Sequence, residues 1–162
     1  MKYYITLALS CWILGNTYAQ TKIPDLNKEI LKYVKSVKGK KVDRGECWDL
    51  AYQALNRVEA DWDKAYVYGN PIDPMNDEVY PGDLIQFENV KTRYMEGNTT
   101  YTSSMIHHTA IVYKVLGKGV YEIAHQNTKF SGRKVGVNTL NLKHVTEGDI
   151  YFYRPTKNRK NE

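Results

Sequence analysis

Residues 43–50 read DRGECWDL, and this stretch decides how the chain is interpreted because it places one cysteine, Cys47, at the start of a helical pattern. Apolar residues then recur on one helix face, at Cys47, Leu50, Ala51, Ala54, Leu55 and Val58. Asp43 and Glu46 have the spacing of a capping box, with aspartate in place of serine or threonine. We therefore expect a helix that begins near residue 46 and carries Cys47 on the inward side of its first turn.

The position of Cys47 allows two interpretations. Free cysteines are often apolar core residues, and Cys47 lies on the apolar stripe. A thiol in the first turn of a helix, however, meets free backbone N–H groups and the positive end of the helix dipole, which favour the thiolate. The other cysteine, Cys11, lies in a segment that we expect to be removed, so Cys47 would have no partner for an internal disulfide. We favour a catalytic thiol.

The first 19 residues have the pattern of a secretory signal peptide: Lys2, an apolar run over residues 3–14, and a small-x-small end at residues 17–19. Cleavage after Ala19 would leave a single domain over residues 20–156 and a polar tail over residues 157–162. The apolar run is too short to span a bilayer comfortably. An alternative interpretation makes Cys11 a lipoprotein cysteine. We expect an exported protein of the periplasm, the cell envelope or the extracellular space.

The composition excludes some classes of partner. The net charge of +5 is mildly basic and lacks the dense basic patch of a nucleic-acid-binding protein. It suits an anionic partner such as a cell wall or membrane surface only weakly. Nothing in the composition fixes the oligomeric state.

The pattern of apolar residues predicts helices first and strands afterwards. A first helix is expected over residues 25–38, ending before Gly39. Strands are expected over residues 84–87, 109–115, 120–124, 135–142 and 149–153. This order predicts an α+β domain in which N-terminal helices pack on a roughly five-stranded antiparallel sheet. The polar and aromatic residues 88–105 read as a long loop or an exposed hairpin.

Three histidines lie at the ends of two of the expected strands. His107 and His108 precede the strand over residues 109–115, and His125 follows the strand over residues 120–124. A two-residue turn at residues 117–118 or 118–119 puts His108 on the same face as His125 and Asn127, because cross-strand neighbours share a face. His107 then points to the other face.

These positions predict a nucleophile, a base and an orienting group. Cys47 would attack a carbonyl, His108 would act as general base, and His125 or Asn127 would orient the imidazole. The backbone N–H of Cys47 would stabilise the oxyanion.

A zinc site would use the same side chains, since Cys47, His107, His108 and His125 are all possible ligands. Adjacent histidines on a strand point apart, and no Cys-x-x-Cys or His-Glu-x-x-His spacing occurs. We therefore expect no metal and no cofactor.

The order of these parts resembles the NlpC-like and CHAP group of papain-related cysteine peptidases. The matching segments are GECWDL (45–50) at the catalytic cysteine, PGDLIQF (81–87) at the first strand, HTAIV (108–112) at the catalytic histidine, IAHQN (123–127) at the third polar residue and GDIYF (148–152) at the closing strand. The resemblance spans about residues 43 to 154.

The resemblance implies hydrolysis of amide bonds, usually in peptidoglycan stem peptides or between peptide and sugar. It assigns the catalytic roles to Cys47, His108 and His125. Glu46 stands where CHAP members often have glutamine, and an acid there would raise the pKa of the thiol unless the helix cap holds its charge. His125 stands where CHAP members often have glutamate, and Asn127 matches their asparagine, so both branches stay open.

Two other functions also fit the sequence. The chain could be an exported thiol amidase or acyltransferase that acts on proteins or small amides. It could instead be a catalytically inactive binding or scaffold domain, with Trp48, Trp62 and tyrosines lining a ligand groove. Ordinary packing is the simpler interpretation of these aromatic residues.

Overall fold

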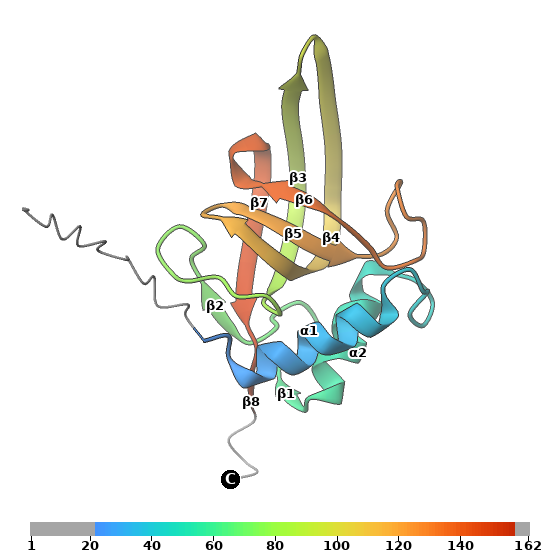
Figure 1. Ribbon diagram of the computed structural model, residues 1–162, viewed down its shortest axis with the longest axis vertical. Helices are drawn as coiled ribbons and strands as arrows, with labels where there is room; N and C mark the ends of the chain where they lie inside the picture. The colour runs from blue at the N-terminus through green and yellow to red at the C-terminus, as the bar shows by residue number, and fades with distance from the viewer. Residues whose placement is uncertain (1–21, 158–162) are drawn as a thin grey trace, which may run out of the picture.

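The computed structural model describes residues 22–157, which form two helices and a six-stranded antiparallel sheet (Figure 1). The helices are α1 (Asp25–Val37) and α2 (Cys47–Arg57). The strands in their order across the sheet are β2 (Asn70–Ile72), β7 (Val145–Arg154), β3 (Leu84–Glu96), β4 (Thr99–Gly117), β5 (Val120–His125) and β6 (Gly136–Asn141). A 3-10 turn, η1 (Leu142–His144), leads into β7, and β1 (Ala60–Asp61) pairs with β8 (Thr156–Lys157).

This architecture confirms the expected α+β class. The proposed signal peptide, Cys11 and residues 158–162 lie outside the described residues.

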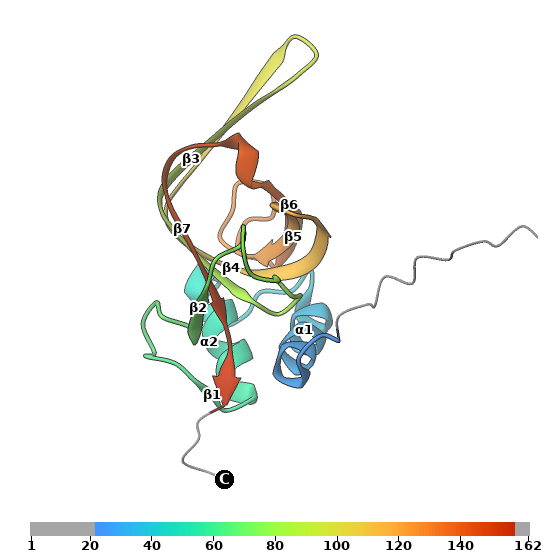
Figure 2. The same ribbon diagram turned by 90° about the vertical axis from the view of Figure 1, so that its left-hand side faces the viewer.

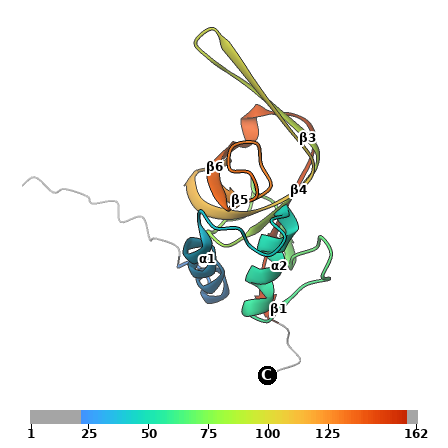
Figure 3. The same cartoon turned by 90° about the vertical axis from the view of Figure 1, so that its right-hand side faces the viewer.

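The sheet curls strongly, and both helices lie on its outer side (Figures 2 and 3). Two apolar cores follow from the alternation of side chains along the strands. The outer core joins the helices to the sheet through Ile30, Val34, Leu50, Ala54, Leu84, Ile111 and Ala124. The inner core fills the concave side with Ile85, Phe87, Ala110, Val112, Tyr121, Ile123 and Phe152.

Helix α2 begins as expected, but its cap differs from the predicted one. The N-cap residue is Glu46, and its backbone N–H donates to the Asp49 carboxylate at 3.0 Å. The prediction of a capping box at Asp43 and Glu46 is therefore wrong by three residues. Asp43 and Gly45 have φ values of 51° and 90°, so they form a turn before the helix.

In the β4–β5 hairpin the residues near His108 and His125 alternate between the two faces as predicted, but the register of the pairing changes along the hairpin. Gly117 pairs with Val120, which makes residues 118–119 the turn. Two irregularities then shift the register by one residue each, so that Ile111 pairs with Ala124. Two shifts restore the original alternation of faces.

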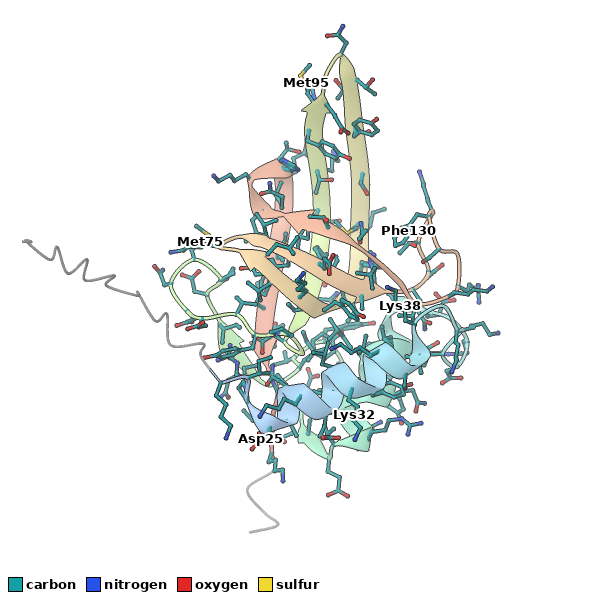
Figure 4. All side chains as sticks on the ribbon, in the orientation of Figure 1. Asp25, Lys32, Lys38, Met75, Met95 and Phe130 are labelled. Atoms are coloured by element: carbon teal, nitrogen blue, oxygen red, sulfur yellow. The ribbon has the colours of Figure 1, made fainter. Side chains whose placement is uncertain are left out.

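Residues 88–105 form an exposed hairpin, which is one of the two predicted alternatives. Strands β3 and β4 stay paired from Leu84 opposite Ile111 to Glu96 opposite Thr99. They project from the body as a two-stranded arm (Figure 1), with Met95 near its tip (Figure 4).

A buried carboxylate, Asp83, ties α1, β3 and β7 together. It accepts hydrogen bonds from Arg154 Nε at 3.1 Å and Nη2 at 2.9 Å, from Asn27 Nδ2 at 2.7 Å and from the Tyr80 N–H at 2.8 Å. Burial raises the pKa of Asp83, and the Arg154 guanidinium opposes that rise. Gly82 before it has φ 94°, and a Cβ there would lie 2.4 Å from the Asn27 carbonyl oxygen. These contacts explain the Pro-Gly-Asp sequence.

We predict that Asp83→Asn lowers the free energy of unfolding by about 3 kcal/mol, because it removes the counter-charge of the half-buried Arg154. Urea denaturation measures the change. Asp25→Asn removes an exposed carboxylate that pairs with the exposed Lys28 and should change stability little. Equal losses in the two variants would contradict the anchoring role of Asp83.

Candidate active site

The start of α2 is attached to the chain just after β5 by the side chain of Gln126. Its amide donates to the carbonyl oxygens of Glu46 at 2.7 Å and Val42 at 3.0 Å, and it accepts from the Val42 N–H at 3.2 Å. Gln126 is fully buried. Cys47, the first residue of α2, therefore lies beside the end of β5.

The thiol of Cys47 lies against β4 near Thr109, where β4 extends beyond the end of its pairing with β5. Burial raises the pKa of Cys47. Hydrogen bonds from the backbone N–H groups of Thr109, Trp48 and Cys47 lower this pKa. Burial outweighs these groups, so the expected shift toward the thiolate is wrong for the resting site. Because Thr109 directly follows His108, its contact with Cys47 brings the thiol next to the histidine strand.

The two histidines predicted to share a face are in contact. His108 and His125 are both buried, and Nε2 of His108 lies 2.8 Å from Nδ1 of His125. The rings meet edge to face, and Phe87 packs against His108 from the inner core. The predicted contact of His108 with His125 is therefore present in the structure, while the catalytic roles of these residues stay predictions.

Both imidazoles are neutral at pH 7. Burial lowers the pKa of His108 to about 4, with a smaller contribution from His107. Burial also lowers the pKa of His125 to about 3, and the neighbouring His108 adds to the effect.

One ring nitrogen of His108 remains available. Nε2 is engaged by His125, and no hydrogen bond within residues 22–157 uses Nδ1. In the same range, no hydrogen bond joins the Cys47 sulfur to either ring. In the resting site the thiol and both imidazoles are neutral, and Nδ1 of His108 can accept a proton only in the tautomer that carries its proton on Nε2.

Asn127, the second candidate for orienting His108, makes a different contact. Its Nδ2 donates to Glu46 Oε2 at 2.7 Å, and Arg133 Nη2 lies 3.3 Å from Glu46 Oε1. The charge of Glu46 contributes to the raised pKa of Cys47, as expected for a neighbouring acid. Arg133 and Asn127 hold this charge.

His107 lies on the opposite face from His108, as predicted. Its Nδ1 is 2.9 Å from the carboxylate of Glu88. Its ring packs edge-on against Tyr66, with the ring centroids 4.3 Å apart. These contacts occupy His107 on the outer side of the sheet.

Trp48 has a packing role in this structure. Its Nε1 donates to the carbonyl oxygen of Ala65 at 2.7 Å, and its ring contacts Tyr52 and Trp62. This cluster supports the simpler interpretation of the aromatic residues.

Three buried residues with polar groups, Tyr68, Gln86 and Thr109, form a network that the sequence analysis does not predict. The Tyr68 hydroxyl lies 2.9 Å from Thr109 Oγ1 and donates to Gln86 Oε1 at 3.1 Å, while Thr109 Oγ1 donates to the same oxygen at 2.8 Å. Burial raises the pKa of Tyr68. These hydrogen bonds hold Thr109, the residue whose backbone N–H contacts the Cys47 thiol. The signal for this network in the sequence is the presence of polar residues, Gln86 and Thr109, within otherwise apolar strands.

The alternative of a zinc site finds no geometric support in the part of the chain that the structure describes. Residues 22–157 contain no group of three or more His, Cys, Asp or Glu side chains placed to hold a metal ion.

The pKa shifts of the histidine pair predict a pH-dependent stability. The unfolded chain, with histidine pKa values near 6.5, binds more protons than the folded protein between pH 6.5 and about 4. The free energy of unfolding should therefore fall as the pH decreases through this window, with His108 contributing about 3 kcal/mol.

Urea denaturation at a series of pH values checks this prediction. His108→Gln should make the fall smaller by about 3 kcal/mol, whereas His144→Gln, which changes a histidine outside the pair, should leave it unchanged. Parallel curves for the wild type and His108→Gln would contradict the burial of a neutral His108.

The fold is similar to that of a solved protein, Ly7917. Its crystal structure, and its crystal structure with the hydrolyzing product of MDP, both align with a TM-score of 0.52. The sequence identities are 15% and 16%, over 78% and 80% of this chain. The match covers 62% of the Ly7917 chain. At this identity the similarity shows the fold alone. No curated protein matches the chain.

The sequence itself matches a described family over most of its length. The match extends over residues 24–161, and the family is described as the AIM3/BBC1 cysteine proteinase-fold domain. The helices on an antiparallel sheet, with Cys47 opening a helix beside β4, agree with such a fold. The chain therefore belongs to the AIM3/BBC1 cysteine proteinase-fold family.

Proposed function

We propose that the chain is a hydrolase that cleaves amide bonds with Cys47 as nucleophile and His108 as general base. The 2.8 Å contact between His108 Nε2 and His125 Nδ1, at the residue directly before Thr109, whose backbone N–H contacts the thiol, is the observation that supports this proposal most strongly. It orients the His108 ring and leaves Nδ1 as the available proton acceptor.

The neutral resting state determines the order of proton transfers. Nδ1 of His108 takes the Cys47 proton as the sulfur bonds to the substrate carbonyl carbon. The backbone N–H of Cys47 stabilises the resulting oxyanion. When the C–N bond breaks, His108 returns the proton to the leaving amine. Water then attacks the thioester carbon, giving its proton to His108, and the C–S bond breaks to restore the thiol and release the carboxylic acid.

His108, and not His107, is the base in this proposal. His107 is on the outer side of the sheet, as α2 is, but its ring is held by Glu88 and packed against Tyr66. His108 directly precedes the residue whose amide contacts the thiol.

Peptidoglycan is the proposed substrate, cut either within the stem peptide or between peptide and sugar. The support is the resemblance to the NlpC-like and CHAP group together with the proposed signal peptide over residues 1–19. Export to the periplasm, cell envelope or extracellular space is part of the same proposal. Within residues 22–157, no helix has the length and apolarity to cross a membrane.

A catalytically inactive binding domain of the same fold is the second candidate. The raised pKa of Cys47 favours it, because burial keeps the thiol protonated at rest. The two candidates differ in whether the thiol is required for any product.

Incubation with purified peptidoglycan, followed by mass spectrometry of the soluble fragments, tests the proposal. We expect the wild type to release stem-peptide fragments and Cys47→Ala to release none. His108→Ala should abolish release, because a positioned general base contributes roughly 10²- to 10⁴-fold. His107→Ala, the matched control on the opposite face, should weaken release at most. Equal fragment patterns for the wild type and Cys47→Ala would contradict a peptidoglycan hydrolase and favour the binding domain.

A further inference from the structure

The second histidine of the pair has an unsatisfied ring nitrogen. His125 is 4% exposed, and its Nε2 is buried without a hydrogen-bond partner within residues 22–157. A buried nitrogen of this kind costs roughly 1–3 kcal/mol when it stays unpaired. The nitrogen therefore needs a partner whenever it carries a proton.

The tautomers of the two rings depend on each other through their contact. For His108 to accept a proton at Nδ1, its own proton must sit on Nε2 and be donated to Nδ1 of His125. The proton of His125 must then lie on the buried Nε2. In the opposite arrangement, His125 donates from Nδ1, His108 carries its proton on Nδ1, and His108 cannot act as a base.

Asn138 on β6 is placed to decide between the two arrangements. Ile123 pairs with Asn138, and His125 pairs with Gly136, so Asn138 lies on the same face as His125, two residues along the neighbouring strand. The Asn138 side chain favours the protonated form of His125, as a hydrogen-bond acceptor does. No hydrogen bond of normal geometry, however, reaches Nε2 of His125 within residues 22–157. Asn138 is exposed.

Phe130, in the loop after β5 (Figure 4), contacts the ring of the same histidine. Its ring centroid lies 5.5 Å from that of His125, and a Cβ at position 136 would lie 2.5 Å from the Phe130 ring. Gly136 thus lets the apolar ring pack beside His125.

We propose that Asn138 is a positioning residue whose side-chain carbonyl accepts the Nε2 proton of His125 and thereby leaves Nδ1 of His108 free to take the Cys47 proton. This inference rests on the proposed function for its catalytic consequence. The tautomers themselves can be measured without any substrate.

Long-range ¹H–¹⁵N NMR of the full chain with ¹⁵N-labelled histidine tests the proposal at pH 7. We expect both His108 and His125 to carry their protons on Nε2. Asn138→Leu should move both rings toward the Nδ1–H form, and Asn138→Asp, which keeps an acceptor, should retain Nε2–H. Thr139→Val changes an exposed neighbour on the other face and should have no effect. Rings that keep the same tautomer in Asn138→Leu would overturn the proposal, as would His125 protonated on Nδ1 in the wild type.

Turnover of the same variants separates this inference from the proposed function. Asn138→Leu should lower the rate about tenfold or more, since part of the general-base contribution is lost, and Asn138→Asp should retain most of it. Tautomers that respond as expected in a chain without hydrolytic activity would support Asn138 and contradict the proposed function. Hydrolysis by a protein whose histidine tautomers do not change in Asn138→Leu would support the proposed function and contradict the role of Asn138.

Discussion

The hydrogen bonds of Gln126 are the constraint on which the candidate site depends. This one buried side chain binds the main chain before α2 and at its N-cap, although 80 residues separate it from Glu46. It fixes the N-terminus of the helix beside the end of β5. The proposed nucleophile, Cys47, comes from the helix and the histidine pair from the sheet, so this attachment sets where the thiol lies relative to β4 and β5.

Burial determines the charge state of the site more strongly than the helix does. A helix N-terminus stabilises a negative charge by about 0.3–1 kcal/mol at an exposed position. Burial of an ionised group in a low-dielectric environment shifts its pKa by up to several units. In this structure burial raises the pKa of Cys47 and lowers those of His108 and His125. The proposed mechanism, in which the thiol ionises only as His108 takes its proton, agrees with these opposite shifts.

Local patterns allowed the sequence to predict the elements and the face of the histidine pair. The spacing of apolar residues located both helices, and the period of two in β4 and β5 placed His108 with His125. That prediction survived two register shifts because each moves the alternation by one residue. The sequence predicts shorter β3 and β4 strands than the structure has, since residues 93–96 and 99–104 are exposed on both faces and give no alternating pattern.

Contacts between distant segments could not be predicted in the same way. The cap was assigned to Asp43 because its spacing from Glu46 is correct, but the turn at Gly45 moves that residue away and Asp49 takes the role. Asn127 was a reasonable partner for His108 by parity, yet its backbone has φ 61° and its amide reaches Glu46. Loop geometry decided both outcomes.

Acylation of Cys47 by p-nitrophenyl acetate, followed by intact-protein mass spectrometry, tests the central claim most directly. The claim is that His108 activates the neutral thiol of Cys47. The wild type and His107→Gln should gain one acetyl group on Cys47 at neutral pH, and folded His108→Gln should gain it much more slowly. Equal acylation rates in the wild type and His108→Gln, or no acylation of Cys47 in either, would contradict the claim.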